Sequence, residues 1–261
     1  MSASGPLASR VAVVTGVSRR AGIGFAIARR LLADGASVLV QSWEAHDASQ
    51  PWGADVDGID AVLDELRGDD LPLAHVAVDL ADPVAPAAVI RAAAAAFGHF
   101  DILVANHARS SSQDLENVTA AELDLSFAVN ARATVLLVQA FAAQHEAPTG
   151  GRVVLFTSGQ HLAPMGGELP YAISKGAVQQ MTRSLADHLA DRAITVNAIN
   201  PGPTDTGWAP PELREKVRAM FPSGRWGTPD DAARLVAWLV SDEAEWITGQ
   251  TVDSEGGFRR S

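Results

Sequence analysis

Cysteine is absent from this 261-residue sequence. A disulfide, a thiolate zinc site and a thiol nucleophile are therefore excluded, and any catalysis must use hydroxyl, amine, carboxylate or imidazole groups. Long hydrophobic runs are also missing, because no apolar run approaches the roughly eighteen residues that a membrane span needs. Met1–Ser9 has neither the basic start nor the apolar stretch of a signal peptide. We therefore expect a cytoplasmic protein that does not bind to a membrane.

Positive charge is scarce as well. The 20 lysines and arginines are outnumbered by 31 aspartates and glutamates, which gives a formal net charge of -11. This charge repels nucleic acid and anionic membranes over most of the surface. The seven histidines show no paired helical spacing like that of a zinc helix. We expect neither a nucleic-acid partner nor a catalytic metal.

Short apolar runs rich in β-branched residues recur along the chain and are typical of buried strands. They lie at 10–16, 36–42, 73–79, 100–106, 151–158, 193–199 and 249–255. Helical periodicity appears between them, over Gly24–Ala33, Val84–Phe97, Ala120–Ala143, Ala172–Ala190 and Asp230–Ser241. This alternation predicts an α/β fold with a doubly wound, parallel, seven-stranded sheet and helices on both faces. No break in composition marks a second domain, so residues 1–261 are expected to form one.

Two segments interrupt this alternation and are predicted to be irregular. Glu44–Gly58 is rich in Asp, Pro and Gly, and Pro201–Pro229 contains five prolines beyond the first. Long loops in compact α/β proteins are often functional. Both segments follow predicted strands, and ligands of open parallel sheets bind beyond the carboxyl ends of strands.

A glycine-rich turn joins the first predicted strand to the first predicted helix. Thr15-Gly16 ends the strand, and Gly22-Ile23-Gly24 begins the helix. Glycine lets the backbone approach a pyrophosphate, and the free amides of a helix N-terminus favour its charge. A tight connection without a ligand gives the same pattern, so the turn alone is weak evidence.

Two polar residues at later strand ends support the same nucleotide site. Asp79 follows the third strand and can accept a hydrogen bond from an adenine amine, or it can cap the next helix. Asn106 follows the fourth strand and is either a turn-forming residue or a ligand contact.

The most informative stretch of the sequence surrounds Tyr171. Lys175 stands four residues later on the same predicted helix, so the two side chains are adjacent. A neighbouring ammonium stabilises a phenolate and lowers its pKa, so Tyr171 can exchange a proton with a substrate oxygen. A surface Tyr and Lys at this spacing are common. Ser158, thirteen residues before Tyr171 at a strand's carboxyl end, favours a catalytic set.

Taken together, these residues resemble the short-chain dehydrogenase/reductases, and within them the many enzymes similar to 3-oxoacyl-carrier-protein reductases. The resemblance covers residues 8–258. Its motifs are Thr15-Gly16 with Gly22-Ile23-Gly24, Asp79-Leu80, Leu103 to Ala108, Asn130, Ser158, Tyr171 with Lys175, Asn200 to Thr206, and residues 247–257.

The resemblance implies a Rossmann-type fold and a nicotinamide cofactor. Ser158, Tyr171 and Lys175 would assist hydride transfer between the nicotinamide and a carbonyl or alcohol carbon. Asn130 matches an asparagine that supports a water molecule in the family's proton relay. The expected cofactor contacts are Gly16, Ser18, Arg19, Arg20, Gly22, Ile23, Gly24, Ser42, Trp43, Asp79, Leu80, Asn106, His107, Tyr171, Lys175, Pro201, Gly202, Thr204 and Thr206.

The sequence departs from the family pattern in three places. The glycine turn is two residues longer than usual. Where the family usually reads Asn-Asn-Ala-Gly, this chain has Ala105-Asn106-His107-Ala108. We interpret His107 as a packed, hydrogen-bonded residue, with a second catalytic acid as the alternative. His161, three residues after Ser158, is a candidate substrate contact.

The choice of cofactor depends on the end of the second strand. An acid there selects free ribose hydroxyls, whereas a 2'-phosphate needs cations and no acid. The selecting position is Ser42, which is neutral, and Trp43 follows as a candidate to stack on the adenine. Arg19 and Arg20 lie in the lengthened turn, where a guanidinium matches a phosphate. Glu44 and Asp47 lie nearby and favour NAD(H). The neutral Ser42 and the two arginines outweigh these acids, so we expect NADP(H) and keep NAD(H) as the alternative.

The leading hypothesis is an NADPH-preferring enzyme that reduces a ketone, such as a 3-oxoacyl thioester or another apolar carbonyl compound, or oxidises the alcohol. Residues 207–225, with Trp208, are expected to form an apolar lid over this substrate. The resemblance implies a homotetramer or a dimer. A nucleotide-binding regulatory or scaffold protein without turnover is the alternative. The complete set of Asn130, Ser158, Tyr171 and Lys175 argues against it.

Overall fold

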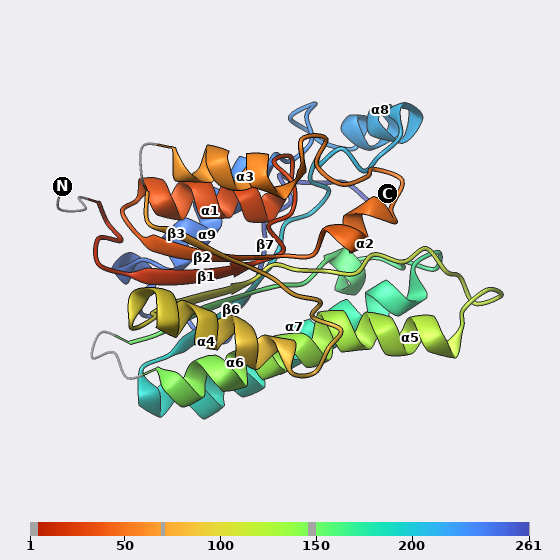
Figure 1. Cartoon of the computed structure of the whole chain (residues 1–261). Helices are drawn as coiled ribbons and strands as arrows, with labels where there is room; N and C mark the ends of the chain where they lie inside the picture. Colours follow the sequence, from red (N-terminus) through yellow and green to blue (C-terminus); the bar gives the residue numbers. More distant parts are fainter. Residues whose placement is uncertain (1–4, 69–70, 146–149, 261) are drawn as a thin grey trace.

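A seven-stranded sheet runs through the centre of the molecule in the computed structural model, which describes residues 5–68, 71–145 and 150–260 (Figure 1). All seven predicted strands are present, and every neighbouring pair is parallel, in the order β3-β2-β1-β4-β5-β6-β7. The predicted doubly wound fold is confirmed. The strands are β1 Val11–Thr15, β2 Ser37–Ser42, β3 Leu73–Ala77, β4 Ile102–Ala105, β5 Arg152–Phe156, β6 Thr195–Asn200 and β7 Thr251–Asp253.

Helices cover both faces of this sheet. In Figure 1, α1 and α3 lie above it and α4, α6 and α7 below it. The helices are α1 Ile23–Ala33, α2 Glu44–Ala48, α3 Gly58–Arg67, α4 Ala85–Phe97, α5 Ala120–Phe127, α6 Ala133–Gln144, α7 Leu169–Leu189, α8 Pro211–Ala219 and α9 Pro229–Leu239.

The strand sequences explain why both faces are covered. Side chains alternate between the two faces of a strand, and in β1 both sets are apolar. Ala12 and Val14 belong to the core between the sheet and helices α1, α3 and α9. Val11 and Val13 belong to the core between the sheet and helices α4, α6 and α7. A strand that is buried on both faces therefore has a continuous apolar run in place of alternation.

The predicted helix Ala120–Ala143 is interrupted in the structure. A π-helical turn, η1 (Ala128–Arg132), separates α5 from α6 and contains Asn130. The segment Ala120–Gln144 is long and apolar enough to cross a bilayer by those two criteria, although half of its most apolar window is buried inside the protein. Such burial is typical of a core helix.

Three helices were not predicted. The segment Glu44–Gly58, expected to be irregular, begins with α2, and α3 follows it. The segment Pro201–Pro229, also expected to be irregular, contains α8. Its prolines do not prevent a helix, because Pro210 is the N-cap and Pro211 is the first helical residue, where proline has no hydrogen bond to lose.

The strand order determines where a ligand can bind. β1 pairs with β2 on one side and with β4 on the other, so the chain leaves β1 in one direction and returns on the opposite side. At such a reversal the loops diverge and leave a crevice beyond the carboxyl ends of the strands.

Candidate active site

Two adjoining cavities lie at the carboxyl edge of the sheet. Their volumes are about 670 Å³ and about 290 Å³. Gly16, Ser18 and Asn106 line both cavities, so the glycine turn separates them. The larger one contains Ser158 and Tyr171, and the smaller one contains Trp43 and Asp79.

The glycine turn is packed too closely for side chains. Gly16 has a φ of +75°, and a Cβ atom there would lie 2.8 Å from the Cα of His107. A Cβ atom on Gly24 would lie 2.3 Å from the Gly16 carbonyl oxygen. Asn106 holds the turn, because its Nδ2 donates to the carbonyls of Thr15 (3.1 Å) and Gly16 (3.2 Å). The N-cap of α1 is Gly22, which has no side chain to accept hydrogen bonds from the first amides of the helix. Gly22 and Ile23 line the larger cavity, a position in which helix amides can bind a phosphate.

The two arginines of the lengthened turn have different partners. The Arg20 guanidinium donates to Asp55 Oδ1 (Nη2–Oδ1 2.6 Å) and also bonds to Asp57. The Arg20 backbone amide donates to Asp55 Oδ2 (2.9 Å). Arg19 extends in another direction and donates to the Thr206 carbonyl (3.1 Å). The longer turn is thus attached to the loop before α3 through Arg20 and to the lid through Arg19.

The smaller cavity is lined by an aromatic ring, an apolar side chain and a carboxylate, a combination that suits a nucleoside. Trp43 is 40% exposed and lines it, and the Trp43 amide donates to Ser18 Oγ (3.1 Å). Ser42 is buried, and its hydroxyl is joined to His75 Nε2 (2.8 Å), so the hydroxyl points away from the cavity. The buried Leu80 side chain and Asp79 line the floor.

Asp79 does not cap the following helix, because α4 begins six residues later with Val84 as its N-cap, and its carboxylate forms a local turn instead. Its Oδ1 accepts a hydrogen bond from the Ala81 amide (2.8 Å). The contact orders the turn after β3 and keeps the carboxylate at the edge of the cavity, where the adenine amine was expected.

His107 is packed inside the protein, as we interpreted it. Its Nδ1 is joined to Thr15 Oγ1 (2.7 Å), and its Nε2 is 3.0 Å from the Val129 carbonyl. A carbonyl can only accept, so Nε2 carries the proton. Burial, together with the charge of Lys175, lowers the pKa of His107 to about 3. The imidazole is therefore neutral at physiological pH and serves as a structural link between β1 and η1.

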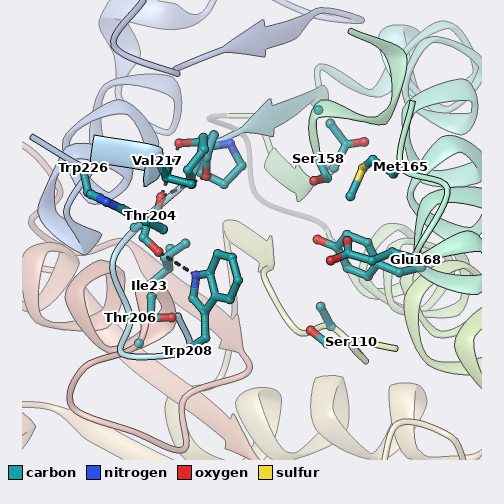
Figure 2. A pocket seen from close by; sticks show the side chains of 18 of the residues that line it. Ile23, Ser110, Ser158, Met165, Glu168, Thr204, Thr206, Trp208, Val217 and Trp226 are labelled. Carbon is teal, nitrogen blue, oxygen red and sulfur yellow. Dashed lines mark hydrogen bonds between the residues drawn. The ribbon is translucent and has the colours of Figure 1, made fainter. Parts of the chain in front are cut away.

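Three residues of the expected catalytic set meet between β5 and α7. Ser158 follows β5 and Tyr171 is in the first turn of α7; both line the larger cavity, where Figure 2 shows Ser158. Lys175 lies one turn further along α7, with its Nζ 5.8 Å from the centre of the Tyr171 ring. That Nζ donates to the Phe156 carbonyl (2.7 Å). This hydrogen bond joins the end of β5 to the start of α7, close to the hydroxyl groups of Ser158 and Tyr171.

The pKa directions at this site differ from our expectation. We expected Lys175 to lower the pKa of the phenol. Burial instead raises the pKa of Tyr171, although a side-chain hydrogen bond with Ser158 opposes the rise. Burial also lowers the pKa of Lys175 to about 7. The ammonium is itself costly to bury, so it is a weaker source of positive charge than an exposed lysine.

Asn130 is fixed by the π-helical turn. Its Oδ1 accepts from the Arg109 amide (2.7 Å), and its Nδ2 donates to the Arg109 carbonyl (3.0 Å) and to Ser174 Oγ (2.8 Å). The side chain therefore joins the loop after β4 to α7 next to Lys175. In a regular α-helix the Asn130 carbonyl would accept only from the backbone amide four residues later. Here it accepts a hydrogen bond from Thr134 Oγ1 (2.7 Å).

The lid lies across the larger cavity from Ser158. Pro201, Gly202, Thr204, Thr206 and Trp208 line this side. The indole of Trp208 donates to the Thr204 carbonyl (3.1 Å) and contacts the Trp226 ring edge to face, at 5.8 Å between centroids (Figure 2). The lid also has a small core of its own, formed by Ala209, Phe221 and Trp226 with Leu213, Val217 and Phe258.

Comparisons with known proteins agree on the family. The model of a family described as enoyl-(acyl carrier protein) reductase matches residues 16–259. An uncharacterized oxidoreductase of Bacillus subtilis, YjdA, is 41% identical over 253 residues, which are 96% of this chain and 97% of that protein. A solved short-chain dehydrogenase/reductase from Serratia marcescens superposes with a TM-score of 0.85 at 32% identity, covering 97% of this chain and 99% of that one. This chain belongs to the short-chain dehydrogenase/reductase family.

Two other members carry cofactor information in their names. A short-chain dehydrogenase from Burkholderia cenocepacia, solved in complex with NADP, is 33% identical with a TM-score of 0.84, covering 97% of this chain and 98% of that one. An NADPH-dependent aldehyde reductase-like protein of Arabidopsis thaliana is 32% identical, over 97% of this chain and 95% of that protein. The closely packed Gly16 and Gly24, together with the glycine N-cap of α1, fit the pyrophosphate of such a nicotinamide dinucleotide.

One expected substrate contact of this short-chain dehydrogenase/reductase lies elsewhere. His161 is not among the residues that line the larger cavity, and its Nε2 lies 3.2 Å from Asp253 Oδ1. The residues after Ser158 form a short 3-10 turn, Gly159–His161, which directs the imidazole toward β7. The expectation was therefore wrong about the direction of this side chain.

Sequence reasoning missed three polar features of the larger cavity. Ser110, Ser111 and Ser112 line it after β4, and Glu168 lines it just before α7. Glu255 and Arg260 also line it, joined to each other as an ion pair (Nη1–Oε2 2.7 Å). Glu168 stands three residues before Tyr171, a spacing that could have indicated it. No local pattern predicts that Arg260 reaches the site.

The segment 255–260, which we call the C-terminal arm, closes one end of the cavity. Glu255 accepts a hydrogen bond from Asn200 Nδ2 (2.8 Å) at the end of β6. The Arg260 guanidinium fills the space where a side chain on Gly159 would lie. The Arg259 amide donates to the Met220 carbonyl of the lid (3.0 Å). The arm therefore connects the catalytic loop with the lid.

Proposed function

We propose that the protein reduces a ketone to a secondary alcohol with NADPH, or catalyses the reverse oxidation, and that one domain holds both cofactor and substrate. The observation that carries the proposal is the position of Ser158 and Tyr171 on one wall of the larger cavity, which adjoins the nucleotide-sized cavity across the glycine turn. The bound nicotinamide would supply or accept the hydride.

The proposed roles of the side chains follow from their environments. Tyr171 keeps its proton at neutral pH because burial raises its pKa, so it can donate that proton to the oxygen of a ketone as the carbonyl is reduced. Ser158 is placed to donate a hydrogen bond to the same oxygen. Lys175 holds the start of α7 against Phe156 and places a partly protonated amine beneath the phenol. Asn130 positions the loop that follows β4.

Replacement of Tyr171 by Phe tests this assignment. The change removes only the proton-bearing oxygen, so kcat should fall by about 100-fold or more, which is typical for lost acid catalysis, while NADPH binding is retained. The assay is NADPH oxidation with a panel of ketones, diketones and 3-oxoacyl thioesters, with nucleotide affinity measured by calorimetry as the control.

Two outcomes of that assay would overturn the proposal. A Phe variant with near-normal turnover excludes Tyr171 as the proton donor. Absence of turnover by the wild type with every compound of the panel favours the alternative, a nucleotide-binding regulatory or scaffold protein of the same fold.

The preference for NADPH is supported by the end of β2. Ser42 is neutral, and two relatives carry NADP or NADPH in their names. We propose that one guanidinium of the lengthened turn, from Arg19 or Arg20, contributes to the recognition of the 2'-phosphate. Arg19 lines the larger cavity. Arg20 is held by Asp55 and Asp57 through its Nε and Nη2 atoms, which leaves Nη1 as its donor toward a phosphate oxygen.

The lid supports an apolar carbonyl compound as the substrate. Trp208, Val217, Met220 and Trp226 present apolar surface to the larger cavity. A cavity of about 670 Å³ is within the range for small-molecule sites. We infer that the carbon skeleton of the substrate lies against this side while its carbonyl oxygen faces Ser158 and Tyr171.

A further inference from the structure

The wall opposite the lid is polar. Figure 2 shows Glu168 and Ser110 on the same side of the cavity as Ser158, across from Trp208 and Trp226. Ser111 and Ser112 line the cavity beside Ser110. We call Ser110, Ser111, Ser112 and Glu168 the polar wall. The three serines have no part in the proton transfer described above. Glu168 enters it only through its charge, which adds to the rise in the pKa of Tyr171.

The carboxylate of Glu168 lacks a counter-charge. Within residues 5–68, 71–145 and 150–260, no ion pair or side-chain hydrogen bond involves it, and burial is the only influence that raises its pKa. The other acid nearby, Glu255, is neutralised by Arg260. A half-buried carboxylate without a partner is unfavourable, and a ligand that donates a hydrogen bond to it removes this cost.

A second polar atom of the wall is also without a partner. In the described part of the chain, Ser111 Oγ is buried and forms no hydrogen bond. Its loop is held firmly, because the Leu169 amide at the start of α7 donates to the Gln113 carbonyl (2.9 Å). The start of α7, which follows Glu168, and the serine loop are therefore fixed next to each other, and residues of both line the larger cavity.

We propose that the polar wall recognises a hydrogen-bond donor of the substrate, a hydroxyl or ammonium group close to the reacting carbonyl, with Glu168 as its principal acceptor. This inference rests on the proposed ketone reduction and narrows its substrate class. The substrate has an apolar part that faces the lid and a donor group that faces Glu168. Ser110 and Ser112, which also line the cavity, can accept from the same donor or donate to a neighbouring oxygen.

Three ketones of equal size test the proposal: 1-hydroxy-2-butanone, 1-amino-2-butanone and 3-pentanone. They differ only in the group on one α-carbon, which is a hydroxyl, an amine or a methyl group. We compare kcat/KM with NADPH for wild type, Glu168→Leu and Glu168→Gln. Glu65→Leu, a change of the same kind at an exposed site on α3, is the matched control. Intrinsic differences in ketone reactivity cancel, because each variant is compared with wild type on the same compound.

Glu168→Leu should lower kcat/KM for the donor-bearing ketones by about 10- to 100-fold, the range for a lost hydrogen bond to a charged group. The effect on 3-pentanone, which has no donor group, gives the baseline, because the change also removes a charge that raises the pKa of Tyr171 for every ketone. Turnover of 3-pentanone also shows that the variant folds. Glu168→Gln keeps a neutral acceptor, so it should preserve the reduction of the hydroxy ketone. Loss of only the amino ketone in this variant identifies an ammonium as the natural donor group.

Equal effects of Glu168→Leu on all three ketones, or no effect on any, would overturn the inference and leave ketone reduction standing. Absence of turnover by the wild type would instead overturn the proposed function. In that event, saturation-transfer NMR with NADP⁺-loaded protein still decides the inference. Contact with 1-hydroxy-2-butanone that disappears in Glu168→Leu supports it, and contact that is equal in both proteins refutes it.

Discussion

Replacement of Lys175 by Met is expected to stabilise the protein while it abolishes turnover. Lys175 is 2% exposed, and its Nζ donates to the Phe156 carbonyl. Burial lowers its pKa from 10.5 to about 7, which means that the folded protein disfavours the charged form. Met has a similar length and flexibility and carries no charge to bury.

The expected gain in stability follows from this pKa change. At about 1.4 kcal/mol for each pKa unit, burial of the charged lysine costs on the order of 5 kcal/mol at a pH below 7. The substitution leaves the Phe156 carbonyl without this donor, which costs about 1–3 kcal/mol. The net gain is therefore about 2–4 kcal/mol. A protein of this size changes its Tm by roughly 2–4 °C per kcal/mol, so we expect a Tm about 4–16 °C higher.

The pH dependence provides the decisive control. Between pH 7 and 10.5 the unfolded chain holds more protons on Lys175 than the folded chain does, so the wild type gains stability as the pH rises through this window. The Met variant lacks this gain, and its advantage should shrink between pH 6.5 and pH 9. The assay is thermal unfolding by circular dichroism without added nucleotide. A variant that is less stable at pH 6.5, or an advantage that is independent of pH, would refute the reasoning.

Three further predictions concern the cofactor, the lid and the assembly. The combined change Arg19→Ala and Arg20→Ala should reduce the preference for NADPH over NADH by about ten-fold or more in kcat/KM; an unchanged preference would show that these arginines do not read the 2'-phosphate. Trp208→Ala should raise KM for good ketone substrates several-fold with little change in kcat, and unchanged kinetics would count against the lid. Light scattering should report a homotetramer, because Phe127 and Ile173 are 51% and 57% exposed on helices expected to pair; a monomer mass of about 27.3 kDa would contradict it.

The sheet was predictable because each strand has a strong local signal. Strands buried on both faces are short, continuous apolar runs, and all seven were present in the sequence. The helices α2 and α8 were missed because they are short or strongly charged and have no fully buried residue. The helix α3 was missed although Ile59, Val62, Leu63 and Leu66 form an apolar stripe at helical spacing. The interruption at η1 was also missed, since a single π-helical turn leaves the apolar pattern of the flanking helices almost unchanged.

The candidate site was predictable where its residues form local motifs. Tyr171 and Lys175 are four residues apart on one helix, and Ser158 stands at the end of a strand. These positions alone predict that the three side chains belong to one site. The partners of single side chains were not predictable. Arg20 bonds to Asp55, which is 35 residues away, and the buried Ser42 bonds to His75 on the neighbouring strand. Such pairs depend on how loops pack against each other across the sheet.

The C-terminal arm has a consequence for the order in which the protein is made. The ribosome synthesises residues 255–260 after all seven strands, yet these residues form one end of the larger cavity. The residues that line the smaller cavity all come from the part of the chain up to Val129, although α1, which follows the glycine turn, packs on the late helix α9. A chain that ends after β7 would thus lack one end of the substrate cavity while it keeps every residue that lines the smaller cavity.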